Sequence, residues 1–120
     1  MIILLTISLL VNVGVLAAVV PGILQDSAGM DAAFGPDTPA RRILTSIYIA
    51  ILVLSAVGLA MLALGWQQQV ATLAVGLLAV QIVYKFLTAG IVGMDNPVVG
   101  ANIPIAILHC VTLATLLRSG

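Results

Sequence analysis

Residues 41–93 read RRILTSIYIAILVLSAVGLAMLALGWQQQVATLAVGLLAVQIVYKFLTAGIVG, and this stretch decides the fold. The segment 43–64 contains no charge and no proline, and the segment 70–92 contains one charge, Lys85. Each segment exceeds the ~20 apolar residues that a helix needs to cross a ~30 Å hydrocarbon core. Because only a short turn at 65–69 separates them, the second segment must run antiparallel to the first. The sequence predicts a transmembrane hairpin.

The composition of the whole chain is that of a membrane protein. Hydrophobic residues make up 62% of the 120 residues and charged residues 7%, and the mean hydropathy is +1.30. A soluble domain carries about 25% charged residues. The formal net charge is zero, which gives no indication of a nucleic-acid partner. We therefore expect the lipid bilayer as the environment and an all-α fold, because the apolar runs are continuous rather than alternating.

Two further apolar segments flank the hairpin. Segment 2–24 precedes a polar loop at 25–40, and segment 97–117 follows a short polar corner. A signal peptide is an alternative interpretation of 2–24, but no Lys or Arg precedes its apolar run, so we expect the segment to be retained. The sequence thus predicts one transmembrane domain, 1–120, folded as an antiparallel four-helix bundle. Its four helices are expected at 2–24, 41–64, 70–92 and 97–117.

The polar loop holds three of the four acidic residues, which are Asp26, Asp31 and Asp37. Within it, residues 28–34 are expected to form one or two turns of an interfacial helix, with Met30, Ala33 and Phe34 facing lipid. The aspartates could form a cation or substrate site. The interpretation that we favour is a solvated loop whose acids lie near the two arginines that follow it.

Those arginines, Arg41 and Arg42, stand where the second helix enters the membrane, after a possible cap at Asp37 or Thr38. Arginines at such a position extend to lipid head groups and mark the cytoplasmic side. Trp66 in the hairpin turn fits an interfacial anchor at the other side. The positive-inside rule therefore favours the polar corners in the cytoplasm and the termini outside.

Polar residues inside the apolar segments are candidates for a site. Gln81 and Lys85 are four residues apart and share a helix face, and His109 is expected at a similar depth. Lys85 either extends its amine to the interface, which is the interpretation that we favour, or meets Tyr48, Gln81 and His109 in a buried polar cluster. Asn12 also needs a hydrogen-bond partner, on a neighbouring helix or on its own backbone.

Small residues recur at helical spacing in the first two transmembrane segments. Gly14, Ala18 and Gly22 form one ridge, and Ala56 and Ala60 form another. Such ridges let a second helix approach closely. That second helix would belong either to the same bundle or to a partner protein.

Motifs for chemistry are nearly lacking. The sequence contains no P-loop, no Gly-x-Gly-x-x-Gly, no Cys-x-x-Cys, no second histidine and no glutamate. We therefore predict neither catalytic residues nor a metal site nor a cofactor, and we expect a non-enzymatic protein. A less favoured alternative makes His109 an axial ligand of a haem iron or a chlorophyll magnesium.

The short loops, the long first polar loop and the entry sequence PDTPARR at 36–42 resemble the DoxX-like family of small bacterial proteins. The resemblance implies a four-helix bundle in the bacterial inner (cytoplasmic) membrane. It also implies an association, in some members, with quinone-linked oxidoreductases. No residue set here allows a catalytic site to be transferred.

Three classes of function are compatible with these features. The favoured one is a non-catalytic accessory or assembly subunit that packs laterally against a larger membrane complex. The second is a small transporter or channel, which would require a homo-oligomer or inverted repeats because four helices alone are few. The third is a redox subunit that binds a quinone or another cofactor near Tyr48, Lys85 and His109.

Overall fold

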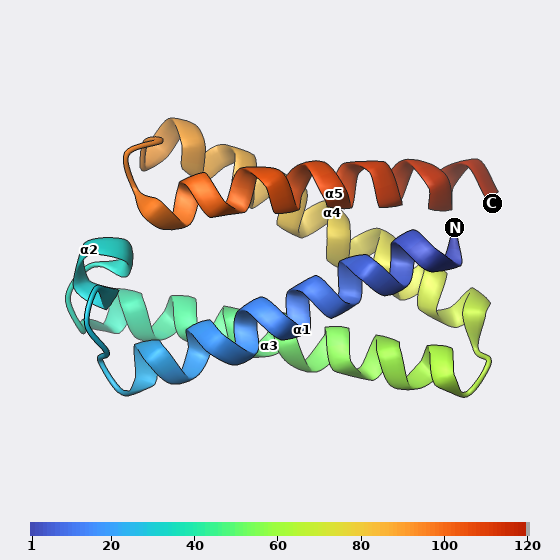
Figure 1. Cartoon of the computed structure of the whole chain (residues 1–120), viewed down its shortest axis with the longest axis horizontal. Coiled ribbons are helices and arrows are strands. Elements are labelled where there is room, and N and C mark those ends of the chain that lie inside the picture. Colours follow the sequence, from blue (N-terminus) through green and yellow to red (C-terminus); the bar gives the residue numbers. More distant parts are fainter. Residues whose placement is uncertain (120) are drawn as a thin grey trace.

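The computed structural model describes residues 1–119, and the side chains of residues 1–118, as a bundle of helices (Figure 1). Within this range there is no strand. The four long helices are each apolar and long enough to cross a membrane. The predicted all-α, four-helix membrane fold is therefore confirmed. The elements are α1 (Ile2–Leu24), α2 (Met30–Phe34), α3 (Pro39–Ala63), α4 (Gln67–Ile91) and α5 (Pro97–Ser119).

The helix boundaries differ from the predicted ones where polar residues join a helix. The helix α3 begins at Pro39, two residues before the predicted segment 41–64 and directly after the predicted cap, because proline suits the first helical position. Thr38 caps it by accepting a hydrogen bond at Oγ1 from the backbone N–H of Arg41, at 3.5 Å. The helix α4 begins at Gln67 because glutamines are good helix formers and the turn needs only a few residues.

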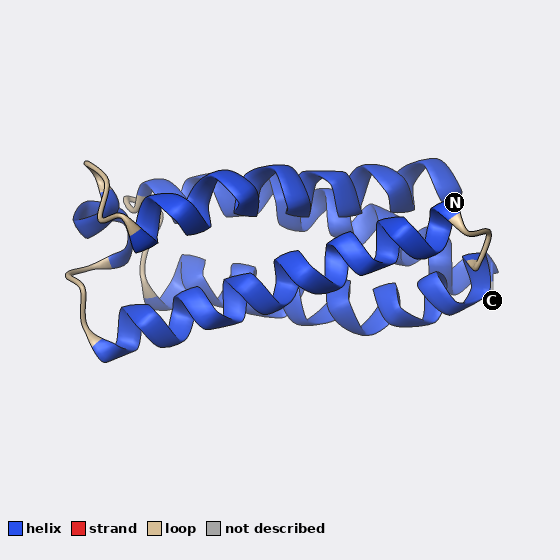
Figure 2. Ribbon diagram, turned by 90° about the horizontal axis from the view of Figure 1, so that it is seen from below, coloured by secondary structure: helices blue, strands red, loops and turns tan. Residues whose placement is uncertain are grey.

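The long helices associate as two antiparallel pairs. The most extensive contacts are those of α1 with α3 and of α4 with α5. Both chain ends and the α3–α4 turn lie at one end of the bundle, and the two polar corners lie at the other (Figures 1 and 2). In Figure 1 the two pairs cross near the chain ends and separate toward the corners, where α2 lies.

The contact between α1 and α3 depends on a small residue that the predicted ridges do not include. A Cβ atom at Gly58 would lie 3.1 Å from a terminal methyl carbon of Leu9, so the two helices approach closely there. By contrast, Gly14 and Ala18 of α1 and Ala56 and Ala60 of α3 are exposed on the surface of the bundle. Gly22, the last member of the first ridge, instead faces the side chain of Met30.

Candidate functional site

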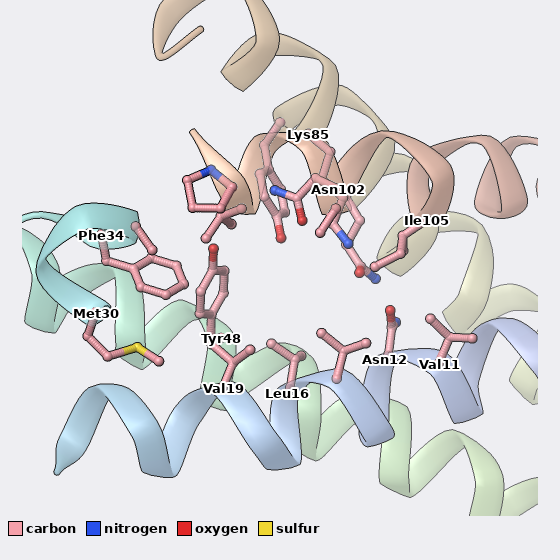
Figure 3. Close-up of a pocket in the computed structure, with 17 residues that line it drawn as sticks. Val11, Asn12, Leu16, Val19, Met30, Phe34, Tyr48, Lys85, Asn102 and Ile105 are labelled. Carbon is pink, nitrogen blue, oxygen red and sulfur yellow. The ribbon is translucent and has the colours of Figure 1, made fainter. Parts of the chain in front are cut away.

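The candidate site is a cavity of about 230 Å³ between the two helix pairs, on the side toward the polar corners (Figure 3). All five helices contribute to its wall. Much of the wall is aliphatic, and this part includes Val11, Val15, Leu16, Val19 and Ile105. The polar side chains that line the cavity are Asn12, Tyr48, Gln81, Tyr84, Lys85 and Asn102.

Lys85 is the charged residue of this cavity. The residue is 6% exposed, and it lies six residues, or about 9 Å, before the end of α4. Its amine nitrogen has neither a hydrogen bond nor an ion pair with any described residue. The nearest recorded partner is the ring of Tyr84, whose centroid is 6.0 Å away, at the outer limit of a cation–π contact. The amine therefore faces the cavity with no counter-charge from the described chain.

Other polar groups face the same space, and three of them have no protein partner. Figure 3 shows Lys85 and Asn102 on one side of the cavity and Tyr48 and Asn12 on the other, with their polar ends pointing into it. Within residues 1–118, three side-chain groups form no hydrogen bond with another group. They are the hydroxyls of Tyr48 and Tyr84 and the side-chain amide of Asn102. The amide nitrogen of Gln81 donates to its own helix, at the carbonyl of Leu77 (3.2 Å).

The structure brings together three of the four residues of the predicted cluster. Tyr48, Gln81 and Lys85 line the cavity, whereas His109 lies outside it, behind Asn12. Sequence reasoning did not place Tyr84 or Asn102 in the site. Neither carried a decisive signal, because Tyr84 is only a sequence neighbour of Lys85 and Asn102 resembles a helix cap after Pro97.

His109 is the centre of a buried hydrogen-bond chain across three helices. Asn12 donates from Nδ2 to the hydroxyl of Ser55 on α3, at 3.1 Å, so its Oδ1 accepts from Nε2–H of His109, at 3.0 Å. Nδ1 of the ring is hydrogen-bonded to the hydroxyl of Ser8, at 3.1 Å, and that hydroxyl is hydrogen-bonded to the hydroxyl of Thr112, at 2.7 Å. Of the two alternatives for Asn12, a partner on a neighbouring helix or on its own backbone, the structure shows the first, with one partner on α3 and one on α5.

These hydrogen bonds engage both ring nitrogens of His109. Ligation of a haem or chlorophyll metal would require one of those bonds to break. Among the described side chains, no group of three or more His, Cys, Asp or Glu residues is placed to hold a metal ion. The ring therefore serves to join α5 to α1 in this structure.

Arg41 is a correction to the sequence interpretation, because it does not extend to lipid head groups. Its side chain is 1% exposed. Nη1 donates to a carboxylate oxygen of Asp31 (3.0 Å) and to the carbonyl of Gly35 (3.0 Å). Nη2 donates to Asp26 (2.8 Å) and to the carbonyl of Ile23 (2.9 Å). One guanidinium thus ties the end of α1 and both ends of α2 to the start of α3.

Arg42 remains at the surface, as expected for a residue at the membrane boundary. Its side chain is 76% exposed and donates two hydrogen bonds to Asp37, at 3.0 and 3.2 Å. These bonds hold the pKa of Asp37 below its ordinary value of 3.8. The acids of the loop therefore neutralise the two arginines, which favours the interpretation without a cation site.

Trp66 is 51% exposed at the start of α4, in the turn at the opposite end of the bundle.

The short helix α2 forms a wall of the cavity, which corrects the expectation that its apolar face meets lipid. Met30 and Phe34 line the cavity, and the ring of Phe34 packs edge-on against Tyr48 with centroids 5.9 Å apart. Asn96 of the second corner donates to the carbonyl of Ala33, at 2.8 Å, and so joins α2 to the α4–α5 pair. Arg41 positions this wall from the other side.

Comparison of the chain with known protein families, with curated proteins and with solved structures found no match. The function must therefore follow from the cavity and its residues.

Proposed function

We propose that this protein binds a small amphipathic molecule within the membrane, in the cavity in front of Lys85. The observation that carries the proposal is a buried lysine whose amine has no protein partner and faces a mainly apolar cavity. A charged side chain inside a transmembrane helix is costly, and such residues generally mark a functional site. This develops the cofactor-binding interpretation of the sequence without assigning redox chemistry to the chain.

The size and composition of the cavity support the proposal. Small-molecule sites are mostly apolar, with a few polar groups that fix orientation. An engineered apolar cavity of about 150 Å³ holds benzene, so the cavity of about 230 Å³ accepts a larger ring or a short chain. No carboxylate, thiol or imidazole is among the residues that line it. This composition favours binding over catalysis.

Native mass spectrometry of the protein in a non-ionic detergent tests the proposal with two probes, octanoate and 1-octanol. Ala101 lines the cavity, and its replacement in Ala101→Trp should fill the space. Ala114 is an exposed alanine of the same helix outside the cavity, so Ala114→Trp is the matched control. We expect one molecule of at least one probe to bind saturably to the wild type and to the control, and neither probe to bind to Ala101→Trp. Equal binding to both variants, or no binding to the wild type, would contradict the proposal.

A second candidate is the accessory subunit, which the exposed positions of the small residues favour. Gly14 and Ala18 face outward, and no atom of another helix lies within 4 Å of a Cβ atom built at Gly14. Close contact between small residues promotes helix association in lipid. The double variant Gly14→Leu/Ala18→Leu should therefore fold normally and lose a co-purifying partner or a homo-oligomer, whereas Ala114→Leu should keep it. Unchanged co-purification and oligomeric state would exclude this face as the contact.

The cellular membrane that contains this protein is also a proposal. The four-helix plan and the PDTPARR entry sequence support a DoxX-like protein of the bacterial inner membrane. Fractionation of native bacterial membranes, with immunodetection of this chain, tests the location.

A further inference from the structure

We infer that the molecule bound in front of Lys85 is an amphipathic carboxylic acid, whose carboxylate meets the amine and whose apolar part lies along α1 and α5. This inference rests on the proposed function and adds the chemical class of the ligand. It follows from the distribution of charge, from the other polar groups of the cavity and from its aliphatic wall.

None of the described residues offers Lys85 a carboxylate partner. Asp26 and Asp31 are bound to Arg41, and Asp37 is bound to Arg42. The fourth acid, Asp95, is an exposed residue of the α4–α5 corner and does not line the cavity. A cation that is removed from water is stable only with a counter-charge or with good hydrogen-bond acceptors. A ligand carboxylate supplies both.

The neighbouring polar groups suit an acceptor of hydrogen bonds. The hydroxyls of Tyr48 and Tyr84 and the amide N–H₂ of Asn102 are donors, and all three side chains line the cavity without a protein partner. A carboxylate has two oxygens, so one can meet Lys85 while the other accepts from these groups. A cationic ligand would be repelled by Lys85, and a neutral carbonyl would leave the amine without a counter-charge.

The aliphatic part of the wall determines the rest of the ligand. It includes Val11, Leu16 and Ile105 and offers an apolar surface to a tail or ring. The volume of about 230 Å³ suits one chain or ring. We therefore assign the site to a single-chain or single-ring acid that enters from the bilayer.

The test compares the affinities of octanoate and 1-octanol, which share a chain and differ in head group. The protein is kept in a non-ionic detergent at neutral pH, where a carboxylic acid in water is ionised, and binding is measured by native mass spectrometry. We expect the wild type to prefer octanoate by roughly tenfold or more, because charge-assisted hydrogen bonds are about twice as strong as neutral ones. The Lys85→Met variant should still bind 1-octanol and should lose the preference for octanoate.

Two further variants separate the amine from other effects. Arg42→Gln removes an exposed cation outside the cavity and should keep the full preference for octanoate. Tyr48→Phe keeps the ring and removes one donor, so it should weaken octanoate binding several-fold and 1-octanol binding less.

The outcomes distinguish this inference from the function on which it rests. If the wild type binds octanoate and 1-octanol equally, or prefers 1-octanol, the carboxylate assignment is wrong and the binding function stands. The assignment is equally wrong if Lys85→Met keeps the preference. If the wild type binds neither probe, both the inference and the proposed function fail.

Discussion

The hydrogen bond between Asn12 and Ser55 gives a quantitative test of how the helices are held together. Both residues are buried, with 3% and 0% of their surface exposed, and the bond joins α1 to α3 at 3.1 Å. Interhelical hydrogen bonds in a membrane protein contribute about 0.6 kcal/mol on average and about 1.7 at most. Asn12→Ala removes this bond and the one to His109, so the free energy of unfolding should fall by about 1.2 kcal/mol from the two bonds.

A double-mutant cycle isolates the single bond. The variants are Asn12→Ala, Ser55→Ala and the combination, and their coupling energy should be about 0.6 kcal/mol. The assay is reversible unfolding in mixed micelles of a mild detergent and dodecyl sulfate, followed by helical circular dichroism. Ser46 is the matched control, because its hydroxyl is exposed and bonds to the carbonyl of Arg42 in its own helix. Ser46→Ala should change the free energy of unfolding by less than about 0.5 kcal/mol.

The reasoning would be refuted by a coupling energy indistinguishable from zero together with equal effects of Ser55→Ala and Ser46→Ala. That result would mean that Asn12 does not join α1 to α3. A coupling well above about 1.7 kcal/mol would show that the bond belongs to a more cooperative network than pairwise values describe.

Three other predictions follow from the polar corners. Arg41→Gln should release α2, seen as a more mobile spin label on that helix, whereas Arg42→Gln should leave its mobility unchanged; equal mobility in both variants would contradict the role given to Arg41. Asp37 should titrate below 3.8 by carbon NMR and return to its ordinary pKa in Arg42→Gln. Because this pKa is depressed in the folded protein, the stabilisation from the pair is present above the ordinary pKa and is lost as pH falls through the folded value. In a background without the native cysteine, Trp66→Cys and Met94→Cys should be labelled from opposite sides of the membrane; labelling from one side would contradict the four-helix topology.

The fold was predictable because it depends on one strong signal, the length of uninterrupted apolar sequence. The limits of α1 were predicted to the residue, and the other long helices differ by a few residues at their ends. The cap formed by Thr38 accounts for the start of α3, and the helix propensity of the glutamines accounts for the start of α4 at Gln67.

The site was predictable only in part, because one sequence does not define which face of each helix points inward. Gln81 and Lys85 were placed together since they are four residues apart on one helix. The meeting of Tyr48 with them, and the separation of His109 from them, depend on helix rotation and crossing. The role of Arg41 was missed for a different reason. An arginine at a membrane boundary has equally good partners in lipid phosphates and in aspartates of the preceding loop, and only the path of that loop decides between them.

Photoaffinity labelling tests the central claim most directly, which is that the cavity in front of Lys85 binds an amphipathic molecule. The probe is a medium-chain carboxylic acid with a diazirine on its chain, applied to the protein in lipid nanodiscs, and the labelled residues are mapped by mass spectrometry. The account predicts labels on cavity residues such as Val11, Leu16 and Ile105, which excess octanoate removes and which Ala101→Trp does not acquire. Labels confined to lipid-facing residues such as Ile43 and Val83, unaffected by octanoate, would contradict it.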